Sequence, residues 1–456
     1  MPFLPVFLPT DLLLWLIVAT GGAYAWYCRR RALLAAPWAR VFQSRTAVAS
    51  SVVVAAFLGA ALLDSVHIRP RVSPPGEVPA QYSNSVLSVL DLSLSYLRER
   101  REKTYSAPLA TRLYAKEQIE TPEGKALRDF PRLAYGGSHL KDESGWAADV
   151  VLRILAGLVG AAGLVFLVAL AGRGLARRYR SVPWPAALWT LGTLLAVGGP
   201  ILALSSGYHV FGTDKVGQDV LYQSLKSIRT ALVIGTLSTL AMLPFGIAFG
   251  IVAGYFKGWV DDLIQYLYTT LNSIPGVLLI AAAVLMMQVY IDTHAEQFPT
   301  AVHRADFRLL MLCLILGVTS WTGLTRLLRG ETLKLSQLDY IQAAQAFGVS
   351  SGRILTRHIL PNVAHIIIIT LVMDFSGLVL AEAVLSYVGV GVDPATTSFG
   401  TMINAARLEM GRDPIVWWSL AAAFVFMFLL VLAANLLADA VRDGFDPRVR
   451  VGVARP

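Results

Sequence analysis

Long apolar runs divide this sequence and limit the folds that are open to it. Nine runs of about 16–28 residues are long enough, or nearly long enough, to cross a bilayer as helices. They are roughly Leu12–Tyr27, Thr46–Leu63, Val150–Ala171, Trp184–Leu204, Ala231–Phe256, Ile264–Tyr290, Leu309–Leu324, Val363–Val390 and Ile415–Leu437. This pattern predicts an all-α polytopic membrane protein.

Composition supports this class and excludes others. Of the 456 residues, 55% are hydrophobic and only 15% are charged, whereas soluble proteins carry about 25% charged residues. The net charge of +9 does not indicate a nucleic-acid partner, because the basic residues cluster beside apolar runs. The two cysteines, Cys28 and Cys313, lie in or beside apolar runs and form no CxxC or Cys/His cluster. Neither a disulfide framework nor a bound metal is expected.

The basic residues also predict a topology. No basic residue precedes the first run, whereas Arg29, Arg30 and Arg31 follow it, which is the opposite polarity to a secretory signal peptide. We therefore expect a retained helix with the N-terminus outside and the C-terminus in the cytoplasm. This orientation places five connections on the cytoplasmic side, and four of them are basic. The five are Arg29–Arg45, Arg173–Arg180, Lys257–Asp262, the loop 326–361 and a C-terminal tail with Arg442, Arg448 and Arg450.

The loop before the eighth run has the character of a helix–turn–helix. Small residues such as Ala343 and Ala344 favour a first helix, which Gly348 interrupts. We expect Ser350 or Ser351 to cap a second short helix that ends before Pro361. Its alanine surface would allow another protein to approach closely.

This segment resembles the EAA loop of ABC-importer inner-membrane permeases. The match is Gln342-Ala343-Ala344, then Gly348, then His358-Ile359-Leu360-Pro361, with Gln342 in place of the usual Glu. The resemblance implies a coupling helix that docks into a groove on a cytoplasmic ATPase. The residues it assigns to ATPase coupling are Gln342, Ala343, Ala344, Gly348, Arg353, Arg357, Leu360 and Pro361.

The amino-acid sequence of the loop is especially similar to that of microcin-C-type peptide-uptake permeases. Further segments are similar to the dipeptide/oligopeptide group of these permeases. They are Phe211–Val220, Ala253–Asp262, Glu382–Gly391 and Asp439–Pro447. The resemblance covers about 211–448. It implies a six-helix type I permease core, 184–448, after an extension, 1–183, with about three additional transmembrane helices, and before a tail, 449–456.

The resemblance also implies an assembly. We expect a second homologous permease, two ATPase subunits that carry ATP and Mg, and an external substrate-binding protein. This chain itself has no Walker A, HExxH or GxSxG motif, so no catalysis and no cofactor are expected on it. The substrate class stays open among peptides, modified peptides, opines and nickel. The alternative is a stand-alone secondary transporter, which would need ion-coupling residues and a repeat of broken helices.

The external connection 65–148 is predicted to be a small soluble insertion or a surface helix. The apolar residues of Val86–Leu97 fit one face of a helix, and the charge run Arg98–Lys103 follows it. The sequence leaves two roles open for this insertion: an addition without a function in transport, or a contact with the binding protein.

Two acidic residues lie within the eighth run. Asp374 and Glu382 are eight residues apart and so share approximately one helical face. They are candidates for a translocation path that meets a substrate amine, or for hydrogen bonds between helices. Asn272 and Asn435 fit interhelical bonding, and Pro244 and Pro275 fit kinks in their helices.

Overall fold

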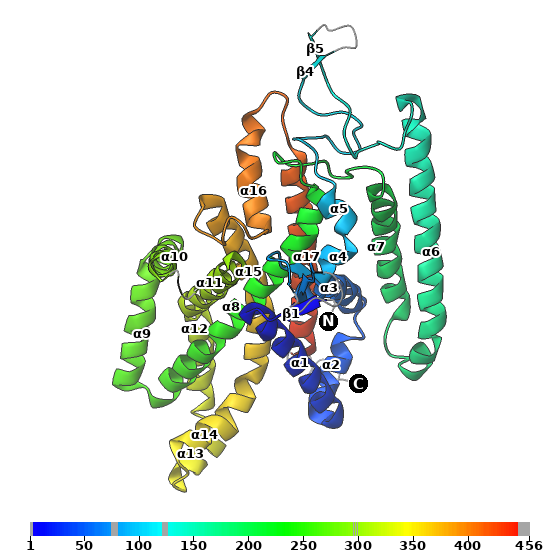
Figure 1. Ribbon diagram of the computed structural model, residues 1–456. Coiled ribbons are helices and arrows are strands. Elements are labelled where there is room, and N and C mark those ends of the chain that lie inside the picture. Colours follow the sequence, from blue (N-terminus) through cyan, green and yellow to red (C-terminus); the bar gives the residue numbers. More distant parts are fainter. Residues whose placement is uncertain are drawn as a thin grey trace. The chain divides into compact units, whose positions relative to one another are not determined.

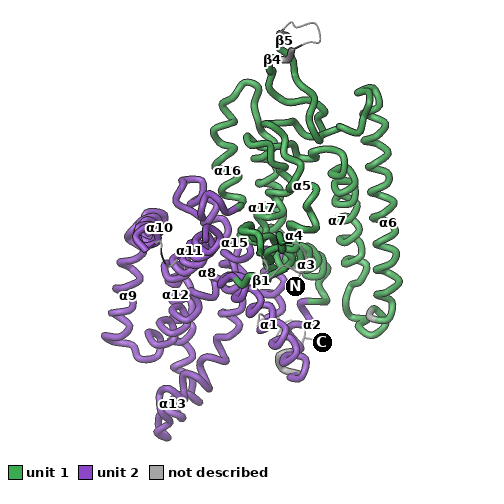
Figure 2. Tube along the Cα trace, viewed as in Figure 1, with its two compact units in different colours: residues 1–7, 42–230, 397–433 green, residues 8–41, 231–396, 434–456 purple. Residues whose placement is uncertain are grey.

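The computed structural model describes residues 3–73, 81–120, 126–294, 296, 298 and 300–445. The chain forms two compact units, which Figure 2 shows in different colours. Unit 1 comprises Met1–Phe7, Phe42–Thr230 and Thr397–Ala433, and unit 2 comprises Leu8–Val41, Ala231–Thr396 and Ala434–Pro456. The division runs through two long helices, so each unit is described by itself.

Most of the labelled elements are helices, as Figure 1 shows. Among the described residues, nine helices are long and apolar enough to span a bilayer, which confirms the predicted all-α polytopic class. They are α1 (Pro9–Arg30), α3 (Arg45–Asp64), α6 (Trp146–Arg178), α7 (Trp184–Ser205), α8 (Val220–Phe256), α10 (Gly276–Thr293), α11 (Ala301–Ser320) with α12 (Thr322–Leu335), α14 (Ser351–Ile354) with α15 (Leu360–Val388), and α17 (Trp418–Phe445).

One predicted span is two helices. The run Ile264–Tyr290 breaks at Ile274, which is extended, and helix α9 (Gly258–Ser273) ends there. Pro275 then begins α10. A proline disfavours helical backbone in the residue before it, so Pro275 separates two helices instead of kinking one. Pro244, by contrast, remains inside α8.

In unit 1, α6 and α7 pack closely because small residues meet. A Cβ added to Gly157 would lie 2.6 Å from the backbone of Gly199. A short antiparallel sheet pairs β1 (Phe3–Val6) with β2 (His67–Pro70), and β2 with β3 (Leu87–Ser88). The strand β1 therefore lies beside the connection that follows α3.

Of the two forms expected for the insertion, the described residues do not show the surface helix. Val86–Leu97 forms β3 and two short helices, α4 (Val89–Ser93) and α5 (Ser95–Glu99). Their leucines, Leu90, Leu94 and Leu97, are buried against Leu221 and Tyr222 of α8. The expectation of an apolar face lying on the outer surface is wrong, because the chain itself covers that face. The remaining elements of unit 1 are β4 (Glu117–Glu120), β5 (Ala126–Asp129), a 3-10 turn at Glu143–Gly145, α16 (Phe399–Arg407) and a 3-10 turn at Glu409–Gly411.

A buried charge cluster connects the insertion to the segment before α8. Glu102, from the predicted charge run, has a side chain only 2% exposed and accepts hydrogen bonds from three backbone amides. Its Oε1 lies 3.4 Å from His209 Nε2, and His209 Nδ1 lies 2.7 Å from Asp219 Oδ2. Burial lowers the pKa of His209, but Asp219 and Glu102 outweigh burial and raise it to about 9.

A second cluster joins α3, the insertion and α8. Lys226 Nζ lies 2.6 Å from Asp64 Oδ1 at the end of α3 and 3.1 Å from Asp91 Oδ1 of α4. The hydroxyl of Tyr222 donates to Asp91 at 2.6 Å. The two clusters make the insertion an integral part of unit 1 rather than a separate appendage.

In unit 2, α8 approaches α12 through glycines. A Cβ on Gly254 would lie 2.6 Å from Thr332, and a Cβ on Gly250 would lie 2.7 Å from Leu328. Helix α1 contacts α11 through Thr10, whose amide donates to Asp306 at 3.2 Å. After α2 (Ala32–Val41), Val41 packs against Gly444 of α17.

Candidate coupling loop and cavity

The first half of the segment 338–361 is as expected: it is a helix that Gly348 ends. Helix α13 (Asp339–Ala346) ends at Phe347, and Gly348 follows with φ +75°. The amide of Val349 donates to Ala344 O at 3.0 Å, and that of Gly348 to Gln345 O at 2.9 Å. This is a Schellman motif, in which a glycine is favoured because a side chain resists positive φ.

The second half differs from the prediction. Ser350 occupies the N-cap position of α14 but makes no side-chain capping bond. The helix does not stop before Pro361. It continues through a π-helical turn, Leu355–Ile359, directly into α15, with Pro361 in the first turn. The π-helical turn directly before Pro361 interrupts the regular pairing of each amide with the carbonyl four residues earlier, a pairing that a proline cannot make.

One side of the loop is fixed in the core of unit 2. Ile341, Ile354 and Ile359 are fully buried and pack with Leu324 and Leu328 of α12. Sequence reasoning missed these anchors, because the loop also contains apolar residues that are not buried, such as Phe347 and Leu355. A loop fixed at both ends can move as a rigid body with the helices that hold it.

The other side of the loop is exposed. Gln342 and Ala343 face solvent, Ala344 is half-buried, and Phe347 beside Gly348 is 87% exposed. Gln342 Nε2 donates to Gln337 O at 3.2 Å.

The basic residues of the loop are also exposed. Arg353 and Arg357 face solvent, and within the described residues neither has an acidic partner. Leu360 is half-buried and Pro361 is exposed. All eight residues predicted for ATPase coupling thus lie on one short continuous segment.

An ion pair fixes the first turn of α9 to α12. Arg329 donates to both carboxylate oxygens of Asp261, at 2.5 Å and 2.6 Å. This pair lowers the pKa of Asp261. The two residues lie in different connections of the sequence, Lys257–Asp262 and 326–361, so sequence reasoning did not pair them.

Asp374 lines a cavity of about 470 Å³ between α12 and α15. The other lining residues are Gly323, Leu324, Arg326, Leu327 and Thr370. Sequence reasoning named Asp374 for a possible translocation path but missed Arg326 and Thr370, whose positions depend on how the two helices pack.

Glu382 lies in a different environment from Asp374. It is 2% exposed, and Ser386 Oγ donates to its Oε1 at 2.6 Å. Ser386 also accepts a bond from Val392 N at 3.4 Å, beyond Gly389, which ends α15 with φ +92°. This network holds the end of α15, and the structure does not bring Glu382 together with Asp374.

The two asparagines bond between helices, as predicted. Ser376 Oγ of α15 donates to Asn435 Oδ1 of α17 at 2.6 Å, and Thr322 Oγ1 of α12 donates to Asn272 Oδ1 of α9 at 3.2 Å. They therefore need no role in transport.

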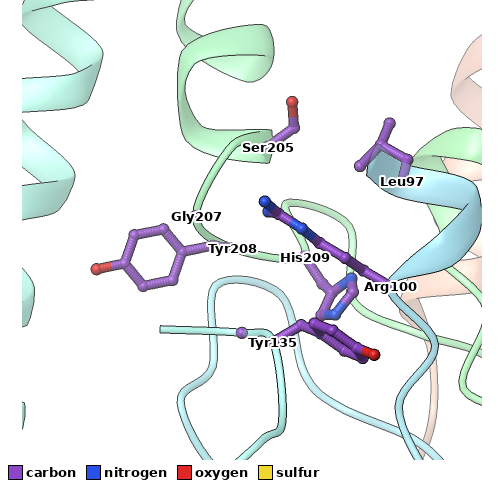
Figure 3. Close-up of a pocket in the computed structure, with 8 residues that line it drawn as sticks. Leu97, Arg100, Tyr135, Ser205, Gly207, Tyr208 and His209 are labelled. Atoms are coloured by element: carbon purple, nitrogen blue, oxygen red, sulfur yellow. The ribbon is translucent and has the colours of Figure 1, made fainter. Parts of the chain in front are cut away.

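A second pocket, in unit 1, is structural. Figure 3 shows His209, Tyr135 and Arg100 among the side chains that line it. It has no room for a water molecule, and Arg100 Nη1 donates to Ser206 O at 2.6 Å. This region is packing around the buried histidine and not a ligand site.

Comparisons with known proteins agree with the sequence resemblance. Residues 246–451 match the family described as "Binding-protein-dependent transport system inner membrane component". The glutathione transport system permease protein GsiD of Pectobacterium atrosepticum is 33% identical over 54% of this chain and 74% of its own length. The oligopeptide transport system permease protein OppC of Mycobacterium tuberculosis is 34% identical over 53% of this chain and 77% of its own.

A more distant relative and one solved structure are also similar. The dipeptide transport system permease protein DppC of Bacillus subtilis is 29% identical over 54% of this chain and 70% of its own. An inward-facing structure of the MetNI methionine ABC transporter aligns over 49% of this chain and 96% of that chain, with 15% identity and a TM-score of 0.33. The sequence matches show that this chain belongs to the family of inner-membrane permease components of binding-protein-dependent ABC importers, which are transport subunits and not enzymes.

Proposed function

We propose that this chain moves peptides or related small solutes across the bacterial inner membrane, driven by ATP hydrolysis on partner subunits. The named cargoes of its relatives, which are glutathione, oligopeptides and dipeptides, support this substrate class. The observation that carries the proposal is the one-sided loop 338–361, in which buried isoleucines fix one face and the other face is exposed.

In this proposal the exposed face docks on an ATPase. Phe347 enters an apolar groove of the ATPase, and Ala343 and Ala344 permit close approach at its side. Arg353 and Arg357 pair with acidic groups there, and this pairing would give them the partners that the described residues do not provide. Gln342 contributes a neutral hydrogen-bonding group where the related motif has a carboxylate.

The proposed assembly contains a second homologous permease, two ATPase subunits that bind ATP and Mg, and an external substrate-binding protein. The N-terminus lies outside and the C-terminus in the cytoplasm. Two observations support this orientation: the basic connections, and the pairing of β1 with β2, which puts the strand before α1 beside the connection after α3.

We also propose the division into an extension, 1–183, a permease core, 184–448, and a tail, 449–456. The two compact units divide the chain at other positions, because residues on both sides of the 183/184 boundary lie in unit 1. The boundary rests on the sequence resemblance. Residues 446–456, with Arg448 and Arg450, lie outside the described residues.

The test is affinity purification of the tagged chain in mild detergent, followed by identification of copurifying subunits and an ATPase assay. Phe347→Asp should abolish recovery of the ATPases, because it places a charge in an apolar groove. The matched control is Leu408→Asp, at a residue 74% exposed in unit 1, which should keep them. Gly348→Ala at the positive φ should weaken recovery less.

Recovery of a second permease and ATPases with the wild type, and loss of the ATPases with Phe347→Asp alone, would support the coupling role. A wild-type chain that purifies alone and still transports would overturn it.

A further inference from the structure

The cavity beside Asp374 has opposite charges on its two walls. Thr370 and Asp374 are four residues apart and so lie on one face of α15, while Gly323, Arg326 and Leu327 lie on one face of α12. Both walls belong to unit 2. A volume of about 470 Å³ falls in the range of pockets that take small molecules.

The two charged residues of the cavity have no partner in the described part of the chain. No ion pair or hydrogen bond joins Asp374 or Arg326 to any described residue. The two side chains also do not form an ion pair with each other, which would need a distance of 4 Å or less. Arg329, one turn further along α12, binds both oxygens of Asp261. The same helix therefore holds one arginine in a complete ion pair and presents another, Arg326, to the cavity.

An intramembrane carboxylate is costly to keep unless something solvates it or pairs with it. Three structural ion pairs elsewhere in this chain are closed at 2.5–2.7 Å: His209 with Asp219, Lys226 with Asp64, and Arg329 with Asp261. The charges of Asp374 and Arg326 are kept apart across an open space instead. This arrangement matches a solute that carries both an ammonium and a carboxylate group.

We propose that this cavity binds a small zwitterionic solute during its passage, with the ammonium group on Asp374 and the carboxylate on Arg326. Thr370 adds a hydroxyl on the same wall as Asp374. The inference rests on the proposed transport function and specifies its substrate class: short peptides or amino-acid-like solutes with free ends. It gives this permease a selectivity of its own, in addition to that of a binding protein.

The test uses a thiol placed in the cavity by Thr370→Cys in the purified importer, in nanodiscs. The rate of labelling by a cationic methanethiosulfonate is measured with and without trialanine. The chain without this substitution gives the background, since Cys28 and Cys313 are buried. The comparison probe is trialanine blocked as its N-acetyl amide.

Trialanine at ten times its Kd should slow labelling about tenfold, and the blocked peptide should not. Asp374→Asn or Arg326→Gln should remove this protection. The matched controls, Asp262→Asn and Arg304→Gln at exposed positions in unit 2, should keep it. Comparing rates with and without peptide in each variant cancels the effect of the substitution on the reagent.

Equal protection by free and blocked peptide, or protection that survives Asp374→Asn, would overturn the inference. A lipid with a zwitterionic headgroup offers the same chemistry, so nanodiscs with and without phosphatidylethanolamine are compared. Slow labelling that requires this lipid and no peptide would assign the cavity to the membrane and also overturn it.

The assay needs neither ATP nor a binding protein. Absence of protection in a preparation that contains the ATPases and takes up trialanine counts against the inference alone. A preparation that never contains ATPases counts against the proposed function.

Discussion

The buried charges of unit 1 and the cavity charges of unit 2 show two uses of costly residues. Glu102, His209 and Asp219 are almost fully buried, and neighbouring groups satisfy both carboxylates. Asp374 and Arg326 face a cavity and have no described partner. The difference teaches that the completeness of pairing, rather than the presence of a charge, separates structural from functional candidates in this chain.

The largest expected effect comes from breaking the buried cluster. Glu102→Ala removes the acceptor of three backbone amides and leaves His209 with one carboxylate. We expect a loss of about 3–5 kcal/mol in the free energy of unfolding, because a partner of a buried charge is removed. Thermal unfolding of the purified chain measures it.

The matched control is Glu99→Ala in the same charge run, where the side chain is 68% exposed. It should change the free energy of unfolding by less than about 0.5 kcal/mol. Equal losses for both variants would contradict the structural reading of Glu102.

The next effect is a dependence of stability on pH. His209 has a folded pKa raised to about 9 above an unfolded value near 6.5. Its contribution is therefore complete below about pH 6.5 and is lost as the pH rises through 9, by on the order of 3 kcal/mol. Unfolding of wild type and His209→Gln is compared across pH 6 to 10.

The wild type should lose stability across this window, and His209→Gln should lose less. At the acid side, Glu102 has its pKa lowered to about 2 by His209 and backbone amides that outweigh burial. Its contribution is complete above about pH 4.5 and is lost as the pH falls through 2. If the free energies of unfolding of the two proteins changed in parallel above pH 7, this explanation would be contradicted.

A smaller effect is expected at the pair between Asp261 and Arg329. This pair is bidentate but partly exposed. Asp261→Asn should lower the free energy of unfolding by about 1–2 kcal/mol. Asp262→Asn, at the exposed neighbour, is the control and should have almost no effect. A larger loss for Asp262→Asn would show that the pair between Asp261 and Arg329 is not the stabilising one.

Much of the fold was predictable from the sequence, and the reasons are physical. Apolar runs and flanking arginines are local signals, so the number and order of the spans followed from them. The break at Pro275 was missed because hydropathy continues across it, and only the backbone restriction of the preceding residue reveals it.

The site was predictable only in part. Gly348 and the small residues of the loop were found because their conformational demands are local. Phe347, Arg326 and the isoleucine anchors were not, since burial and exposure depend on packing between distant helices. Glu102 was missed for the same reason, because a charge run normally remains solvated.

The most direct test of the difference between paired and unpaired charges is Asp374→Asn, with unfolding and ATP-driven trialanine uptake measured on the same preparation. We predict a change of less than about 0.5 kcal/mol in unfolding, together with a clear loss of uptake per folded molecule. A destabilised protein whose folded fraction takes up trialanine normally would contradict the account.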